Sequence, residues 1–116
     1  MKFLCLAYGD EKAWNALSKK EQDRLLSQDD MLRKRGDVVA AVDQAAKTVT
    51  AWEGTPMVTD SAFSISRLPL AGFYIVEASD INEAIQLIAN TPCARAKGAI
   101  EVRAIEQHKD AGRART

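Results

Sequence analysis

The stretch AGFYIVEA at residues 71–78 decides the fold class of this chain. It is rich in aromatic and β-branched residues, which favour a strand, and apolar side chains occupy both of its alternating faces, as Phe73 and Tyr74 illustrate. The stretch KFLCLAYG at residues 2–9 has the same two-sided pattern. We therefore expect two central strands in a sheet that is covered on both faces.

A helical region is predicted after the first strand. Residues 11–35 read as helical, in one or two pieces, and Leu25 belongs to their apolar stripe. Ser18 and Glu21 have the spacing of a capping box, so a helix should begin near residue 19. Gly36 follows a basic last turn and should end it.

A second helix is predicted after the strand at 71–78. Ser79 or Asp80 should cap it, and it should end by Asn90, before a Thr-Pro pair. We expect its stripe of Ile81, Ile85 and Ile88 to face the core. The other strand candidates are residues 37–43, 47–53, 55–59 and 99–105, with a long loop over 59–70.

The predicted order is β-α-β-β-(β)-β-α-β, which is a ferredoxin-like α+β pattern. Right-handed crossovers place both helices on one face of an antiparallel sheet. The other face is apolar yet bare, so we expect a homodimer that forms through this open sheet face. Residues 1–106 are predicted to form a single domain, and residues 107–116 a polar, frayed C-terminal tail.

The charge balance argues against two classes of function. The 116 residues include 16 Lys and Arg and 16 Asp and Glu, so the formal net charge is zero. A nucleic-acid-binding protein or a polybasic membrane-binding protein would carry a basic surplus. We therefore expect no nucleic acid and no membrane as partners.

The cysteines and apolar runs indicate a cytoplasmic protein. Cys5 lies in an apolar run and Cys93 in an expected loop, and the spacing of neither matches a metal site or a disulfide framework. No stretch approaches the ~20 apolar residues that cross a bilayer, and the first apolar run is too short for a secretion signal. Without a phosphate-binding or dinucleotide-binding motif, we expect no cofactor and no metal.

Four segments carry a family resemblance. They are FLCLAYGDE at residues 3–11 followed by Trp14, VTDSAF at 58–63, LAGFYIVE at 70–77 and AIEVR at 99–103. In this order they resemble the YCII-related superfamily, and specifically its DGPF branch, which is named after an Asp-Gly-Pro-Phe motif. The resemblance covers about residues 1–105.

The resemblance implies a dimeric α/β-barrel built from ferredoxin-like subunits, with a pocket between the sheet and the motif loop. The activity of the DGPF branch is largely unassigned. Some members resemble companions of extracytoplasmic-function sigma factors, and distant relatives are proposed as enzymes that use a His–Asp pair. The single histidine of this chain, His108, lies beyond the last strand, where we expect no catalytic role.

This chain departs from the family pattern at the motif. Its ends are kept as Asp60 and Phe63, but Ser-Ala replaces Gly-Pro. The family usually continues Ala-Glu-Thr-Lys-Glu, whereas this chain reads Ser-Ile-Ser-Arg-Leu. Both acids are thus replaced by Ile65 and Leu68, and the basic position remains as Arg67. If the acids act in the family, this member is expected to be altered or inactive.

Two polar residues near the motif are candidates for chemistry. Asp60 is the catalytic candidate, as a general base, but it could equally cap its turn by accepting backbone N–H bonds. Arg67 could bind an anionic ligand bidentately, or it could be a solvated surface residue. The resemblance adds Phe63 to the ligand-binding set.

The end of the first strand supplies three more ligand-binding candidates: Tyr8, Asp10 and Trp14. Pockets often form at strand ends, although packing and helix capping would also account for these residues. Glu101 and Arg103 alternate with apolar residues and share one face, where they could be solvated or paired at an interface.

Three functions remain open from the sequence. The first is a homodimeric module that binds a small anionic ligand or acts in regulation, with a degenerate site. The second is a small dimeric α/β-barrel enzyme, a lyase, isomerase or dehalogenase-like protein acting on an anionic organic acid. The third is an accessory protein associated with a sigma factor.

Overall fold

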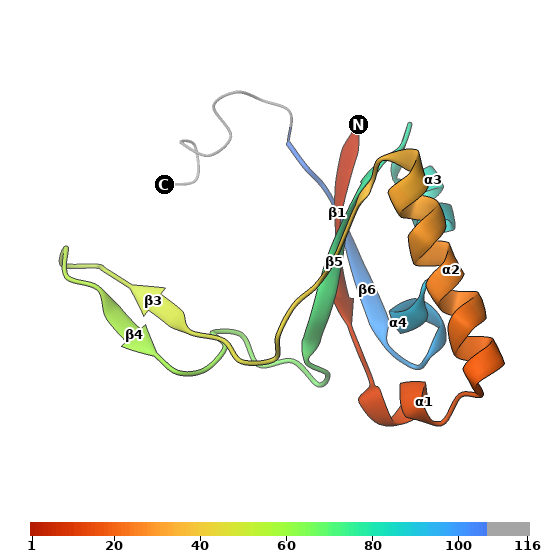
Figure 1. The fold of residues 1–116 in the computed structure, drawn as a ribbon. Coiled ribbons are helices and arrows are strands. Elements are labelled where there is room, and N and C mark those ends of the chain that lie inside the picture. Colours follow the sequence, from red (N-terminus) through yellow and green to blue (C-terminus); the bar gives the residue numbers. More distant parts are fainter. Residues whose placement is uncertain (107–116) are drawn as a thin grey trace.

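The fold is an α+β arrangement in which one antiparallel sheet carries every helix on the same side (Figure 1). The computed structural model describes residues 1–106, so the predicted tail and His108 lie outside the described residues. The elements are β1 Lys2–Tyr8, α1 Glu11–Asn15, α2 Lys19–Arg35, β2 Val38–Ala41, β3 Thr48–Thr50, β4 Met57–Thr59, β5 Leu70–Glu77, α3 Ile81–Ile88, α4 Pro92–Arg95 and β6 Ala99–Ala104.

The main sheet has the strand order β2-β5-β1-β6, and all its neighbours are antiparallel. This order is compatible with the predicted ferredoxin-like fold. The two strands chosen from their two-sided apolar pattern, β1 and β5, are the central pair, and Cys5 lies opposite Tyr74 in their register. The helix-side residues of both strands are buried in the core, which accounts for the apolar side chains on that face.

Local signals set the ends of the helices as predicted. The Ser18 Oγ accepts a hydrogen bond of 3.1 Å from the Glu21 N–H, and α2 ends at Gly36 in the left-handed conformation, with φ 97°. The Asp80 carboxylate likewise accepts from the Glu83 N–H at 2.8 Å and begins α3. A side-chain acceptor at these positions satisfies a backbone N–H that has no partner inside the helix.

The core lies between the sheet and the helices. Phe3, Cys5, Tyr74 and Val76 point from β1 and β5 toward this side, where they are buried with Leu32, Ala84 and Ile88. The expected stripe on α3 is only partly correct. Ile88 is buried, but Ile81 and Ile85 are exposed, because the small side chain of Ala84 is the one that packs against the sheet.

The opposite face of the sheet has no covering element within the described residues. Leu4, Leu6, Phe73 and Ile75 lie on this open face, because residues that alternate along a strand point to opposite sides. They remain partly exposed in the single chain. The second cover that the sequence led us to expect on the sheet is thus not found within residues 1–106.

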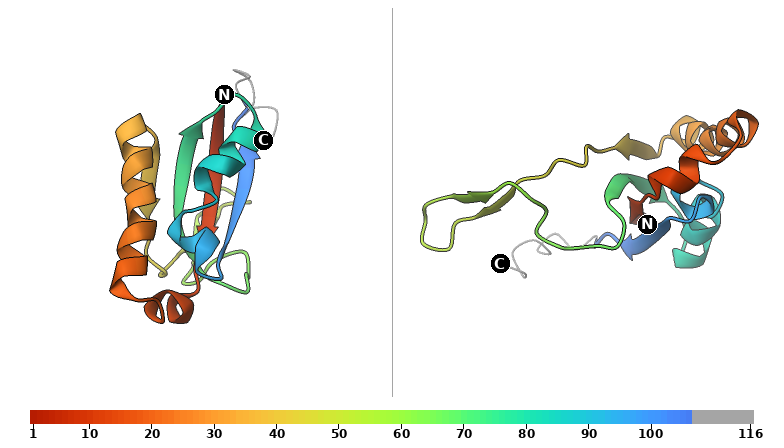
Figure 2. Two further views of the ribbon diagram at one scale, coloured as in Figure 1. Left: turned by 90° about the vertical axis from the view of Figure 1, so that its right-hand side faces the viewer. Right: turned by 90° about the horizontal axis from the view of Figure 1, so that it is seen from below.

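The chain differs from the prediction between β2 and β5. The segments expected at 47–53 and 55–59 do form strands, but they pair with each other as a separate two-stranded sheet (Figure 2). Both edges of β5 are already paired, with β1 and with β2, so these segments cannot join it. They form an arm that extends away from the main sheet, with Val49 opposite Val58.

A short helix, α4, occupies the place where a loop with Cys93 was predicted. Pro92 stops α3, as expected, but it is also the first residue of α4. Proline suits this position because the first N–H of a helix has no acceptor anyway. Among residues 1–106, no helix is both long and apolar enough to cross a bilayer.

Candidate functional site

Three cavities surround the end of the sheet at which β1 finishes. We call them the helix-side cavity, of about 230 Å³, the open-face cavity, of about 730 Å³, and the loop cavity, of about 490 Å³. The helix-side and loop cavities share Pro69 and Leu70, and the open-face and loop cavities share Tyr8 and Ile65. The loop that leads into β5 thus borders all three.

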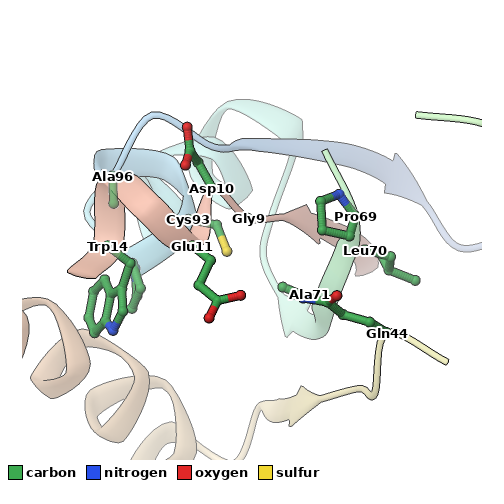
Figure 3. A pocket seen from close by; sticks show the side chains of 11 residues that line it. Gly9, Asp10, Glu11, Trp14, Gln44, Pro69, Leu70, Ala71, Cys93 and Ala96 are labelled. Carbon is green, nitrogen blue, oxygen red and sulfur yellow. The ribbon is translucent and has the colours of Figure 1, made fainter. Parts of the chain in front are cut away.

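The helix-side cavity is mainly apolar and has an acidic rim (Figure 3). Trp14 and Glu11 come from α1, and Cys93 comes from α4. The Glu11 carboxylate and the Cys93 sulfur point toward the middle of this space. Asp10 also lines it, but one carboxylate oxygen accepts from the Ala13 N–H at 3.0 Å and caps α1. The two carboxylates disfavour an anionic ligand here.

The wall of the helix-side cavity depends on a close approach at Gly9. A Cβ at this residue would lie 3.2 Å from the Ala71 Cβ and 3.4 Å from the Cys93 sulfur. The Gly9 N–H also donates to the Pro69 carbonyl at 3.1 Å. A larger residue would therefore press on both sides of the cavity.

The open-face cavity collects cationic side chains. Arg67, Lys97 and Arg103 line it, together with Tyr8 and Glu101. The Tyr8 hydroxyl donates to the Glu101 carboxylate at 2.8 Å, and an Arg103 nitrogen lies 3.7 Å from the same carboxylate. The hydrogen bond to Glu101 raises the pKa of Tyr8 above its ordinary value, so the phenol stays protonated at neutral pH.

The structure brings some predicted site residues together and separates others. Asp10 and Trp14 line the helix-side cavity, whereas Tyr8 and Arg67 line the open-face cavity. From the sequence, Tyr8 was grouped with Asp10 and Trp14 at the end of the first strand. They are separated because Tyr8, the last residue of β1, points to the open face, and the chain then turns toward the helices to begin α1.

Asp60 and Phe63 lie at the base of the arm and line none of these three cavities. The Asp60 carboxylate forms an ion pair with the Lys47 ammonium group, and its side chain is 80% exposed. Phe63 is 82% exposed. The structure thus gives the predicted general base a lysine partner across the arm, in place of the cavity or the turn amides that were considered.

Sequence reasoning missed Glu11, Cys93 and Lys97 as cavity residues. The Thr-Pro pair before Cys93 is also a helix-start signal, so a helix there could have been considered. Lys97 has a φ of 62°, which is a left-handed conformation. This conformation is uncommon for lysine, and no local sequence signal predicts it here. Within residues 1–106, no three His, Cys, Asp or Glu side chains are grouped so that they could hold a metal ion.

A comparison with known protein families finds a match over almost the whole chain. The model of the YCII-related domain matches residues 1–109. The chain belongs to the YCII-related family. This confirms the family level of the resemblance that the four sequence segments indicated.

Two proteins similar to this YCII-related chain illustrate how far the likeness extends. An uncharacterised protein of Rhizobium meliloti (strain 1021) is 27% identical over 118 residues, covering 94% of this chain and 95% of that protein. Among solved structures, the 5-chloro-2-hydroxyhydroquinone dehydrochlorinase of Burkholderia phenoliruptrix AC1100, in complex with 2,5-dihydroxybenzoquinone, is 20% identical. The match covers 94% of this chain and 97% of that one, with a TM-score of 0.49.

Proposed function

We propose that this YCII-related protein is a homodimeric module that binds a small organic anion in the open-face cavity. The observation that carries the proposal is the convergence of Arg67 and Lys97 on this cavity. Neither has an acidic partner among the described residues. An unneutralised cation at a cavity wall favours a carboxylate or a phosphate on the ligand.

The charge count at the cavity supports an anion. Three cations, Arg67, Lys97 and Arg103, face one carboxylate, Glu101, which already accepts from Tyr8. An anion entering between Arg67 and Lys97 would therefore meet a net positive wall.

The other residues that line the cavity indicate what the rest of the ligand should be like. Leu6, Ile65 and Leu68 are apolar, and Tyr8 offers an aromatic ring. The volume, about 730 Å³, lies in the range of ligand pockets, roughly 300–1,000 Å³. We infer a compact organic acid whose apolar or aromatic body lies along this lining while its acidic group meets the cations.

The same face of the sheet supports the homodimer. Leu4, Leu6, Phe73 and Ile75 form an apolar surface that the single chain leaves partly exposed. A second copy packed on this surface would make a dimeric α/β-barrel and would also close the open-face cavity. We further propose, from the four sequence segments, that the chain belongs to the DGPF branch of the family. We also propose a reducing, cytoplasmic setting, which the free thiols Cys5 and Cys93 support.

An enzymatic alternative is favoured by one contact. Glu101 lies in the open-face cavity and holds the Tyr8 hydroxyl, so this pair could exchange a proton with a bound anion. In this alternative Glu101, and not Asp60, is the general base. A lyase, isomerase or dehalogenase-like reaction would then require Glu101, whereas binding alone would require only the cations.

The proposal is tested by titration calorimetry with benzoate and with inorganic phosphate as probes. We expect Arg67→Gln to weaken benzoate binding by about 10- to 100-fold, because a charge-assisted hydrogen bond contributes roughly 1.5–3 kcal/mol. Lys20→Gln, which removes an exposed cation at the start of α2, is the matched control and should leave binding unchanged.

Three outcomes would contradict the proposal. They are no binding of either probe by the wild-type protein, equal weakening by the two variants, or binding that survives Arg67→Gln unchanged. A Glu101→Gln variant then separates the alternatives, since it should abolish turnover in an enzyme and only alter affinity in a binding module.

A further inference from the structure

The arm carries an apolar surface that its own chain does not cover. We define the arm as residues 48–59, which comprise β3, β4 and the turn between them. Trp52 at its tip is 92% exposed, and Val49, Met57 and Val58 are exposed as well. An isolated two-stranded hairpin is only marginally stable in water. The arm therefore needs a surface to pack on.

The direction of the arm indicates where that surface lies. The helices lie on one side of the main sheet, and the arm extends from the other side (Figure 1). The view from below shows the same relation (Figure 2). The arm thus borders the space in front of the open face, and any molecule that packs on Leu6 and Phe73 must lie beside it.

We propose that the arm packs against a second copy of this chain that is seated on the open face. The inference rests on the homodimer of the proposed function and adds to it a reciprocal exchange of arms. In a dimer with two-fold symmetry, each arm reaches alongside the partner, so every contact occurs twice.

The area involved suits a stable interface. Aromatic side chains bury ~150–250 Å² each, so Trp52 of the arm and Phe63 at its base would remove roughly 300–500 Å² per chain from water. A standard interface buries about 800 Å² per partner. Further apolar area comes from Val49, Met57 and Val58 of the arm and from the four apolar side chains of the open face. With these side chains, the buried area per chain is comparable to that of a standard interface.

Charge favours a second copy over a charged partner. The base of the arm is neutral, because Lys47 and Asp60 form an ion pair with each other. Between β3 and β4 the turn carries one charge, that of Glu53. The whole chain has a formal net charge of zero, so two copies do not repel each other.

The exchange also bears on the proposed site. Ile65 lines the open-face cavity yet is fully exposed in the single chain. A partner seated on the open face beside the arm would cover this rim residue and enclose the cavity. The ligand would then be excluded from bulk water on the side that is open in one chain.

The test uses the full-length chain with a photo-reactive benzoylphenylalanine in place of Trp52. Irradiation of the protein, at a concentration where sedimentation shows a dimer, should yield a covalent dimer on a denaturing gel. The same photo-reactive residue in place of Met31, an exposed position on the helix side, is the matched control and should yield no covalent dimer.

In parallel, a Trp14→Phe variant leaves Trp52 as the single tryptophan, so that its fluorescence reports on Trp52 alone. Its acrylamide quenching should be roughly threefold weaker in the native state than in urea, because an interface core excludes water.

The outcomes separate the two proposals. A dimer by sedimentation in which position 52 does not cross-link and Trp52 is quenched as in urea would overturn the exchange of arms and keep the sheet-face dimer. A folded monomer by sedimentation at high protein concentration would overturn both. Equal cross-linking from positions 52 and 31 would indicate random collisions and would also overturn the exchange.

Discussion

Single residues at the sheet decide how closely neighbouring strands approach. At Gly72 of β5, a Cβ would lie 2.3 Å from the Ala40 carbonyl oxygen of β2. This contact involves backbone on both sides, so no side chain can turn away to relieve it. The pairing of β2 with β5, and hence the root of the arm, depends on the absence of a side chain at this position.

Gly72→Ala should therefore lower the free energy of unfolding by about 3 kcal/mol, within the range for overpacking against a rigid neighbour. Urea unfolding followed by circular dichroism measures the loss. Gly54→Ala is the control, because Gly54 has nothing within 4 Å and only its φ of 90° opposes a side chain, at a cost of about 1 kcal/mol. Equal losses in the two variants would contradict the close approach at Gly72.

The two thiols should differ in reactivity. Burial, and secondarily the charge of Asp37, raises the pKa of the Cys5 thiol to about 11. Burial also raises the pKa of Cys93, but this thiol borders the helix-side cavity. Because the thiolate is the reactive form, Cys5 should resist alkylation at pH 8 while Cys93 reacts slowly. Mass spectrometry after iodoacetamide treatment should find one label in the native protein and two in urea. Equal labelling rates in the native protein would refute this.

At the scale of elements, a partly buried polar contact links α2 to the sheet. The Tyr74 hydroxyl of β5 donates to the Asp29 carboxylate of α2 at 2.8 Å. Burial raises the pKa of Asp29, the hydrogen bond from Tyr74 lowers it, and the net shift is upward. The folded state therefore holds the Asp29 proton more tightly than the unfolded chain does. This contribution to stability is fully present at low pH and is lost as pH rises above about 4.

Asp29→Asn should remove this pH dependence, because the amide oxygen still accepts from Tyr74 but carries no charge. We expect the variant to be at least as stable as the wild type at neutral pH, with the advantage disappearing as the pH falls toward 4. Tyr74→Phe should cost roughly 1–2 kcal/mol at neutral pH, since it leaves the carboxylate without its donor. Unfolding curves at several pH values measure both, and a variant Asp29→Asn that is less stable at pH 7 would contradict the argument.

At the scale of the whole molecule, the sheet has an apolar face on each side and helices on one side only. The covered side buries Phe3, Cys5 and Val76, whereas the open side leaves Leu6 and Phe73 partly exposed. A sheet of this kind in one chain is a surface for association or aggregation. The homodimer and the exchange of arms would both follow from this single imbalance.

A charge on the open face should therefore be damaging. We expect Leu6→Glu to give aggregated or unfolded protein, because the carboxylate would be buried without a partner in the dimer. Met31→Glu places the same charge on an exposed residue of α2 and should be tolerated. Sedimentation and circular dichroism distinguish the results, and a folded, monomeric Leu6→Glu protein would show that the open face is not an obligate interface.

Patterns of neighbouring residues determined most of the secondary structure, so the sequence alone was enough to predict it. The two-sided apolar runs identified β1 and β5, and Ser18, Gly36 and Asp80 marked helix ends, because a cap or a left-handed glycine acts within one turn of its own position. The YCII-related family could also be recognised from the sequence, through four short segments in order.

Only the tertiary structure decided which of these residues meet. It separated Tyr8 from Asp10 and Trp14, gave Asp60 a lysine partner, and placed Lys97 and Arg67 on the wall of the same cavity. These outcomes depend on strand pairing between distant segments: β5 pairs with β1 and with β2, and the two segments after β2 pair with each other. A local pattern carries no information about which edges are already taken, and for that physical reason the arm and the position of the site could be read only from the folded chain.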